Sequence, residues 1–220
     1  MRLNKLLAQH LNISRRSADL LIKSGRVSFN DKKASIGIDI SDINTVKVDG
    51  KKLPPAKSFK YIKLNKPIGY VCSRRGQGSH TIYELLPNEL QDLNPIGRLD
   101  KDSSGLLLMS NDGAYINLMA HPTFSKVKIY RVTLDQDLTN ADKNKIENGS
   151  VKLADGVSRF KIISNGKNLE AHLVEGRNRQ IRRTFKALNY NVTQLERIQF
   201  GNYRLDGLKK SQFQPINKDM

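Results

Sequence analysis

The sequence of 220 residues contains one cysteine, Cys72. A single cysteine excludes an intramolecular disulfide and is typical of a reducing compartment, so we expect a cytoplasmic protein. No run of about 18 apolar residues occurs, which excludes a membrane-spanning helix. A long amphipathic apolar stripe is also missing, so we expect no attachment to a membrane surface.

Motifs that hold cofactors are missing as well. The four histidines are scattered without the spacing of metal ligands, and no Cys-x-x-Cys pair occurs. The phosphate-binding pattern GxxxxGK[ST], the dinucleotide pattern GxGxxG and the nucleophile elbow GxSxG are all absent. We therefore expect an enzyme with this sequence to work without a metal ion, a nucleotide or a flavin.

Acidic residues are few relative to basic ones: 21 Asp and Glu stand against 38 Lys and Arg, a formal net charge of +17. Such an excess indicates a polyanionic partner, because Lys and Arg that neutralise phosphates release counterions. Hydrophobic residues form 38% of the chain, which is enough for a folded core. The charge alone leaves RNA, DNA and an anionic membrane surface as alternatives.

Residues 1–56 form a basic segment with 11 Lys and Arg against 5 Asp, a net charge of +6. Leu3, Leu6 and Leu7 share one face of a predicted helix, and Ser14 is placed to cap a second helix that ends at Gly25. The clustering of charge on these helices favours an RNA-binding module over an ordinary solvated surface. The basic residues that we expect to bind RNA there are Arg2, Lys5, Arg15, Arg16, Lys23 and Arg26.

The remaining chain is predicted to form a second domain, residues 57–220. Paired prolines in the segment 53–58 predict a linker between the two, since proline resists helix formation. Strands outnumber helices and do not alternate regularly with them, so we predict an α+β fold with a large, mainly antiparallel sheet flanked by short helices. The expected strands are 59–64, 129–134, 160–163 and 169–174, and the expected helices are 112–120 and 178–188.

The segment Gly97–Gly105 is a polar loop that leads directly into an apolar strand. Glycines at both ends allow the backbone to turn tightly, which would present Asp100 at the edge of a buried sheet. From spacing alone, a cation-binding or capping loop built on Asp100 and Asp102 is an equal alternative.

A second segment, EGRNRQIRRTFK, carries a run of arginines. On a helix, Arg179, Arg182, Arg183 and Lys186 would occupy one face, whereas Ile181 would face inward. Such a stripe of like charge needs anions, either RNA phosphates or a carboxylate such as that of Asp100. A solvated basic face is the alternative. We expect three arginines of this segment to bind RNA, Arg177, Arg179 and Arg183.

A third segment, KVKIYRV, alternates as a strand and places Lys128, Tyr130 and Val132 on one face. A strand tyrosine is most often a half-buried core residue. The alternative is that Tyr130 stacks on a nucleobase or places its hydroxyl near reacting atoms.

Together with LNKPIGYVCS and LMAHP, these segments closely resemble the RsuA/RluB-type ribosomal RNA pseudouridine synthases over essentially the whole chain. GRLDKDSSGLLLMSNDG is the most specific stretch, and EGRNRQIRRTFKAL supports it. MRLNKLLAQ and SRRSADLLIKSGRV similarly resemble the S4 RNA-binding domain. The resemblance implies that residues 1–56 are an S4-like domain and residues 57–220 a catalytic domain.

The resemblance also assigns roles to five residues. It implies that Asp100 is the catalytic carboxylate, that Tyr130 approaches the target base, and that Arg182 pairs with Asp100. Ile181 matches a residue that floors the uridine pocket, and Arg98 one that fills the gap left by a flipped base. No cofactor is implied, in agreement with the missing motifs.

The implied partner is ribosomal RNA, or a ribosomal subunit precursor, bound by a monomer. EGRNR favours the large-subunit 23S RNA, and MRLNK leaves the 16S RNA as an alternative. Two rival functions remain: a non-catalytic RNA-binding assembly factor on the same scaffold, and a metal-dependent nuclease that uses Asp100 and Asp102.

Overall fold

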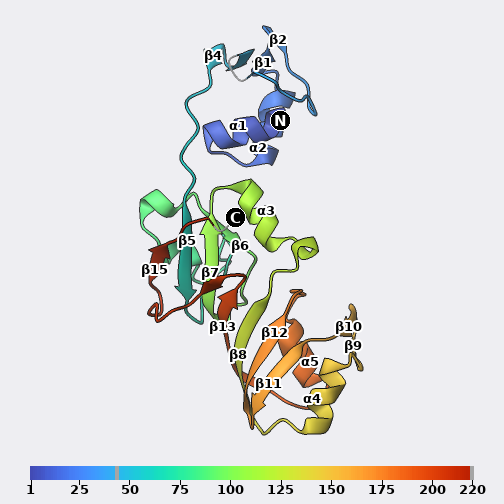
Figure 1. The fold of residues 1–220 in the computed structure, drawn as a ribbon. Helices are drawn as coiled ribbons and strands as arrows, with labels where there is room; N and C mark the ends of the chain where they lie inside the picture. The colour runs from blue at the N-terminus through green and yellow to red at the C-terminus, as the bar shows by residue number, and fades with distance from the viewer. Residues whose placement is uncertain (43–44, 219–220) are drawn as a thin grey trace. The chain divides into compact units, whose positions relative to one another are not determined.

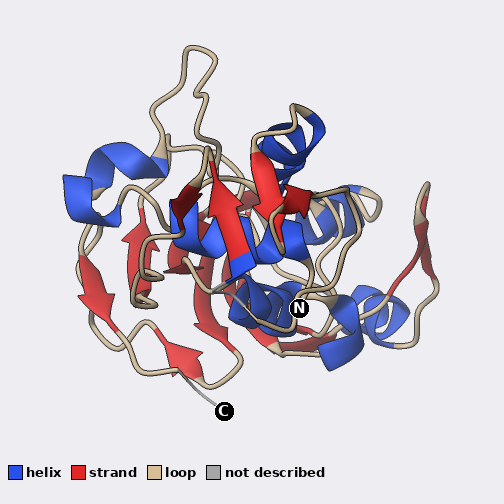
Figure 2. Cartoon of the chain, turned by 90° about the horizontal axis from the view of Figure 1, so that it is seen from above, coloured by secondary structure: helices blue, strands red, loops and turns tan. Residues whose placement is uncertain are grey.

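The computed structural model describes residues 1–42 and 45–218. Contacts within the chain divide it into two compact units, Met1–Phe59 and Lys60–Met220, and each is described here by itself (Figure 1). The helices and strands are short and are joined by extensive loops (Figure 2). No helix among the described residues is long and apolar enough to cross a membrane.

The first unit packs two helices against a small antiparallel sheet. Ser14 caps the second helix by accepting a hydrogen bond from the Ser17 backbone N–H, as the sequence predicted. Leu3, Leu6 and Leu7 are buried on one face of the first helix, also as predicted. The helices are α1 (Leu3–Leu11) and α2 (Arg15–Lys23), and the strands, in spatial order, are β2 (Lys32–Lys33), β1 (Val27–Phe29), β3 (Val46–Val48) and β4 (Lys51–Lys52).

The second unit is built on one large sheet, in which all strand pairs except β7 with β13 are antiparallel. This confirms the predicted α+β class with a mainly antiparallel sheet. The strands along the sheet are β11 (Lys161–Asn165), β12 (Asn168–Leu173), β8 (Lys128–Leu134), β13 (Val192–Phe200), β7 (Ser104–Ser110), β5 (Tyr61–Lys66) and β15 (Phe213–Pro215). Beside this path, β6 (Asn94–Ile96) pairs with β7 and β14 (Tyr203–Arg204) pairs with β13.

Short helices cover the sheet. Asp112 begins α3 by accepting hydrogen bonds from the backbone N–H groups of Ala114 and Tyr115. At the other end, Phe185 and Tyr190 pack with the apolar faces of β8 and β12 in one buried cluster. The α-helices are α3 (Gly113–Ala120), α4 (Asn140–Glu147) and α5 (Gln180–Lys186), and a separate hairpin is formed by β9 (Val151–Leu153) and β10 (Gly156–Ser158). Short 3₁₀ turns cover 82–85, 88–90 and 122–124.

Two predicted elements have different bounds in the structure. The strand expected at 59–64 is Tyr61–Lys66, so Lys66 belongs to the sheet and is buried in it. The helix expected at 178–188 is only Gln180–Lys186. It begins late because Arg179 adopts a left-handed conformation, with φ of 47°, which a helix cannot contain.

Candidate active site

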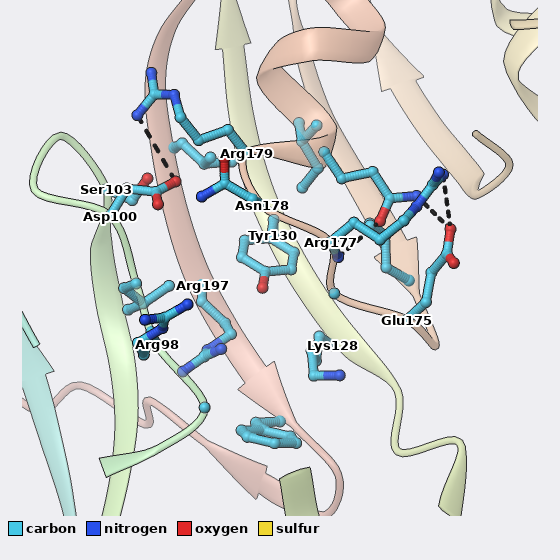
Figure 3. A pocket seen from close by; sticks show the side chains of 18 of the residues that line it. Arg98, Asp100, Ser103, Lys128, Tyr130, Glu175, Arg177, Asn178, Arg179 and Arg197 are labelled. Carbon is cyan, nitrogen blue, oxygen red and sulfur yellow. Dashed lines mark hydrogen bonds and ion pairs between the residues drawn. The ribbon is translucent and has the colours of Figure 1, made fainter. Parts of the chain in front are cut away.

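A cavity of about 270 Å³ opens in the second unit, where β8, β12 and β13 meet two loops (Figure 3). One loop is the segment Gly97–Ser103 that precedes β7, and the other is the segment 174–179 that precedes α5. Of the site residues predicted from the sequence, the structure brings six to this cavity: Arg98, Asp100, Tyr130, Arg177, Arg179 and Ile181.

A buried lysine, Lys66, donates hydrogen bonds to the backbone of the loop that carries Asp100. The Lys66 side chain has no exposed surface, and its ammonium donates to the backbone oxygens of Pro67 at 3.0 Å, Asp100 at 3.0 Å and Ser103 at 2.7 Å. Burial lowers the pKa of Lys66, and the nearby carboxylates oppose that effect. The hydrogen bonds to Asp100 and Ser103 fix the two ends of the turn between these residues, and the bond to Pro67 connects the turn to the end of β5.

Gly105 allows β13 to approach this loop closely. A Cβ atom at Gly105 would lie 2.3 Å from the backbone oxygen of Arg197, and the φ of Gly105 is +100°. Both observations exclude an ordinary side chain, because the strand pair and the backbone conformation each require glycine. The close parallel pairing of Gly105 with Arg197 thereby places the Arg197 side chain at the same cavity as Asp100.

The carboxylate of Asp100 lies near the opening of the cavity, with a side chain 32% exposed, and Arg179 provides the nearest ion-pair partner. Oδ2 of Asp100 lies 3.8 Å from Nη1 of Arg179. Arg179 also donates two hydrogen bonds of 2.8 Å to the carboxylate of Asp102. These hydrogen bonds hold the pKa of Asp102 below its ordinary value and outweigh the opposing effect of burial. The arginine therefore joins the two carboxylates of the loop.

Arg182 does not make the ion pair with Asp100 that we expected. Its Nε lies 3.2 Å from Oδ2 of Asp102, and Nη2 donates to the Asp102 backbone oxygen at 2.7 Å. Nη1 donates to the backbone oxygen of Val192 at 2.8 Å. Arg182 thus braces the Asp100 loop through Asp102, while Arg179 is the arginine within ion-pair distance of Asp100.

The expected basic stripe is also divided. Arg183 donates two hydrogen bonds, of 3.0 and 2.7 Å, to the carboxylate of Asp155 in the β9–β10 turn. Arg177 reaches the same carboxylate at 3.2 Å and donates to the Val157 backbone oxygen at 2.7 Å. Because Arg179 leaves the helix and turns to Asp102, the arginines do not form one continuous charged face. Intramolecular carboxylates already compensate Arg177, Arg179 and Arg183.

Tyr130 and Ile181 form the apolar part of the cavity. Tyr130 lies on β8 and is half-buried, in contact with two of the core clusters. Ile181 is 5% exposed and lies at the start of α5. Leu173 and Leu195 add to the apolar lining. This combination of an aromatic ring, aliphatic side chains and the carboxylate of Asp100 suits a flat polar ring such as a nucleobase.

The sequence interpretation missed several residues of the cavity. Ser103, Glu175, Asn178 and Arg197 all line it, and none was predicted as a site residue. Lys128 was predicted only to share a strand face with Tyr130. The motif signal points to contiguous loop residues, whereas Arg197 lies in β13, outside those motifs, and reaches the cavity through strand pairing. Among the described residues, no group of three or more His, Cys, Asp or Glu side chains has the arrangement of a metal site.

The six basic residues of the first unit that were predicted to bind RNA fall into two kinds. Arg26 makes a bidentate ion pair with Asp49, at 2.9 and 2.6 Å, which raises the pKa of the arginine. Arg2 lies 3.7 Å from the Asp39 carboxylate and donates to the Gly37 backbone oxygen. The remaining four are exposed on α1 and α2, and no ion pair is seen for them among the described residues: Lys5, Arg15, Arg16 and Lys23.

Comparison with known proteins gives consistent results. The family model of RNA pseudouridylate synthase matches residues 60–187. A ribosomal large subunit pseudouridine synthase B of Buchnera aphidicola is 37% identical over 93% of this chain and 88% of its own. A dual-specificity RNA pseudouridine synthase RluF of Escherichia coli is 33% identical over 100% of this chain and 76% of its own.

A solved structure supports the same assignment. A crystal structure of a pseudouridylate synthase matches with a TM-score of 0.71 and 28% sequence identity, covering 99% of this chain and 96% of the other. The family match begins where the second unit begins, and the cavity with Asp100 lies within that unit. The chain therefore belongs to the RNA pseudouridylate synthase family, whose members are isomerases.

Proposed function

We propose that the protein converts a specific uridine of ribosomal RNA, in the 23S molecule, to pseudouridine with Asp100 as the catalytic carboxylate. The observation that carries this proposal is the convergence of Asp100, Tyr130 and Ile181 on one cavity from three separate segments. The reaction breaks the bond between N1 of uracil and C1′ of ribose and joins C1′ to C5. C5 loses its proton and N1 gains one, so the overall change is an isomerisation.

Asp100 has the environment that such a reaction requires. An ionised carboxylate can act as a nucleophile or as a base. The Arg179 guanidinium places a positive charge 3.8 Å from the Asp100 carboxylate, and the hydrogen bond from Lys66 to the Asp100 backbone oxygen fixes the position of the loop. Three routes use such a carboxylate: addition to C6 of the base, attack on C1′, or removal of a sugar proton.

The target uridine has to leave its stack before Asp100 can reach it, at a cost of a few kcal/mol. Tyr130 offers a ring face worth about 1–3 kcal/mol per stacked base, which offsets much of that cost. Ile181 adds a buried aliphatic side chain to the lining of the cavity. Arg98 is exposed at the cavity, where its long side chain can occupy the space that the flipped base leaves.

The first unit is proposed to be an S4-like RNA-binding domain. Its support is the concentration of exposed cations on α1 and α2, namely Lys5, Arg15, Arg16 and Lys23, which are suited to contact phosphates. Arg2 and Arg26 are occupied by Asp39 and Asp49, so they are second choices for RNA contacts. Such contacts would position the enzyme on structured RNA without reading its sequence.

The Asp100→Asn variant tests the catalytic assignment. Asn is nearly isosteric but is neither a base nor a nucleophile, so release of tritium from C5-labelled uridine in ribosomal RNA should fall to background. Binding of the RNA should stay within about threefold, because Asp100 adds no attraction to phosphates. Turnover by this variant at the wild-type rate would remove Asp100 from the mechanism. Persistence of wild-type activity in EDTA would exclude the metal-dependent nuclease alternative.

The target assignment rests on the named relatives. The Buchnera protein is named for the large ribosomal subunit and is 37% identical to this chain. Mapping pseudouridines in both ribosomal RNAs from a strain that lacks the gene should show one missing site in 23S RNA. Loss of a 16S site instead would contradict the 23S assignment and retain the activity. An unchanged map, together with inactivity of the purified protein, would favour the assembly-factor alternative.

A further inference from the structure

The cavity has two ends of different character. At the end near the opening lies Asp100, with its side chain 32% exposed. At the other end lie Arg197, which is 1% exposed, and Phe200, which is fully buried. In the view of Figure 3, the Tyr130 ring lies between Asp100 at the top and the side chains of Lys128 and Arg197 below it.

The Arg197 guanidinium is fixed in position by the protein, but one of its hydrogen-bond donors has no acceptor there. Its Nε donates to the Leu106 backbone oxygen at 2.7 Å, and its guanidinium carbon lies 5.0 Å from the centre of the Phe200 ring. Nη2 is buried and has no hydrogen-bond partner among the residues that the structure describes. The ammonium of Lys128 lies over the same ring at 5.2 Å. The side chains of Arg197 and Lys128 thus both pack on the Phe200 ring, and both line the cavity.

No carboxylate neutralises this pair within the described part of the chain, where every ion pair involves other residues. Burial and the charge of Arg197 lower the pKa of Lys128, and the charge of Glu175 opposes them without reversing the shift. A buried, unpaired cation destabilises a folded protein, so its retention beside a cavity indicates a ligand that supplies the missing acceptor.

The orientation of a nucleotide in this cavity follows from the covalent structure of RNA. The phosphates of a flipped nucleotide remain in the chain outside, so the base enters first. If Asp100, near the opening, acts at the junction of ribose and base, the far edge of the ring reaches the buried end. In uracil that edge carries the carbonyl oxygen O4, whereas cytosine carries an amino group there.

We propose that Arg197, assisted by Lys128, recognises O4 of the flipped uracil and thereby selects uridine over cytidine. The proposal rests on the proposed function and adds a specificity-determining residue to it. Arginine and lysine only donate hydrogen bonds, so they match a carbonyl oxygen and leave a cytosine amino group without an acceptor. A buried donor that loses its partner in this way discriminates strongly against the wrong base.

The experiment combines enzyme variants with changes to one substrate atom. The substrate is a synthetic RNA hairpin around the mapped target, with uridine or with 4-thiouridine, whose sulfur is a weaker acceptor. Single-turnover rates are measured for the wild type, Arg197→Gln, Lys128→Met and the control Lys167→Met, which alters an exposed lysine in the β11–β12 turn. The ratio of the two rates isolates the contact with O4 from intrinsic differences in reactivity.

The wild type and Lys167→Met should lose about tenfold in rate with 4-thiouridine, because a charged hydrogen bond is weakened. Arg197→Gln should already react slowly with uridine. Its rate with 4-thiouridine should be lower than its rate with uridine by less than about twofold. Lys128→Met should lose less rate than the wild type when uridine is replaced by 4-thiouridine. This variant tests the proposal if Arg197→Gln fails to fold. An equal loss in every protein, or no loss in the wild type, would overturn the proposal.

Two further outcomes are distinguishable. If the variants lose sensitivity to a neutral methylphosphonate next to the target, and not to 4-thiouridine, the two cations bind an RNA phosphate and the proposal is wrong. If the wild type forms no pseudouridine in the unmodified hairpin or in ribosomal RNA, the proposed function fails first, before any variant is compared.

Discussion

Arg179 and Asp102 form the tightest charged contact at the cavity, two parallel hydrogen bonds of 2.8 Å between residues 77 positions apart in the chain. The pair connects the loop that precedes α5 with the loop that precedes β7. Because Arg179 also lies 3.8 Å from Asp100, Asp102 determines where the charge beside Asp100 is placed. We therefore regard Asp102 as a positioning residue, and not as a second catalytic carboxylate.

Replacing Asp102 by Ala should lower kcat by about 10- to 100-fold, because Arg179 and Arg182 both lose the carboxylate that orients them. KM for RNA should change less than about threefold, since phosphate contacts remain. Single-turnover and steady-state rates of pseudouridine formation would measure both effects.

The matched control for Asp102→Ala is Glu196→Gln. It breaks the surface ion pair of Glu196 with Arg131, which is 3.1 Å long and does not border the cavity. This variant should retain activity within about twofold, because exposed ion pairs contribute little. Equal losses in the two variants would contradict a positioning role for Asp102.

The ion pair of Arg179 with Asp102 should also make the free energy of unfolding depend on pH in the acid range. The hydrogen bonds from Arg179 hold the pKa of Asp102 below the ordinary 3.8. A lowered pKa in the folded state stabilises the fold above the unfolded value, and this contribution disappears as the pH falls through the folded value. Urea unfolding should therefore show Asp102→Asn less stable than the wild type at pH 6, with a gap that closes below pH 3.8. A gap that stays constant into strong acid would sink this explanation.

Lys66 should matter for both folding and catalysis. In Lys66→Met, three backbone oxygens lose their buried donor, so the free energy of unfolding should fall by about 3 kcal/mol. The freed Asp100 loop should also lower kcat. Lys60→Met is the control: the Lys60 ammonium donates to one surface carbonyl, of Glu89, and its loss should cost less than about 0.5 kcal/mol. Urea unfolding compares the two variants directly, and similar values would contradict the role given to Lys66.

The parts of the site that lie within one contiguous segment could be predicted from the sequence. Gly97 and Gly105 do adopt positive φ, and Asp100 lies in the loop between them, just before the buried strand β7, as their spacing indicated. Tyr130 faces the cavity because strand alternation places every second residue of β8 on one side. In these cases, local backbone geometry alone fixes the direction of the side chain.

Contacts between distant segments could not be predicted in this way. Arg179 adopts a left-handed conformation and pairs with residues elsewhere in the chain. The sequence pattern therefore suggested a longer helix, and the family resemblance named Arg182 as the partner of Asp100, whereas Arg179 is the arginine within ion-pair distance. Asp155 captures Arg183 from a hairpin that no motif marks. Arg197 reaches the cavity only because β13 runs parallel to β7 at Gly105, which depends on the topology of the whole sheet.

The exposed cations of the first unit give the last prediction. Arg15 and Arg16 lie on α2 without an ion pair among the described residues, whereas Lys51 and Lys52 are exposed on β4 of the same unit. If α2 contacts phosphates, changing Arg15 and Arg16 to Gln should reduce the slope of log binding constant against log salt by about 0.9 per lost contact. The matched double change at Lys51 and Lys52 to Gln removes the same charge and should alter the slope less. Filter binding to ribosomal RNA over a salt series would measure both.

Equal reductions would mean that only the net charge of the unit matters, and a larger effect of the β4 change would place the RNA on the sheet. Deleting residues 1–56 should weaken RNA binding more than either double change while the remaining unit keeps its catalytic rate on saturating RNA.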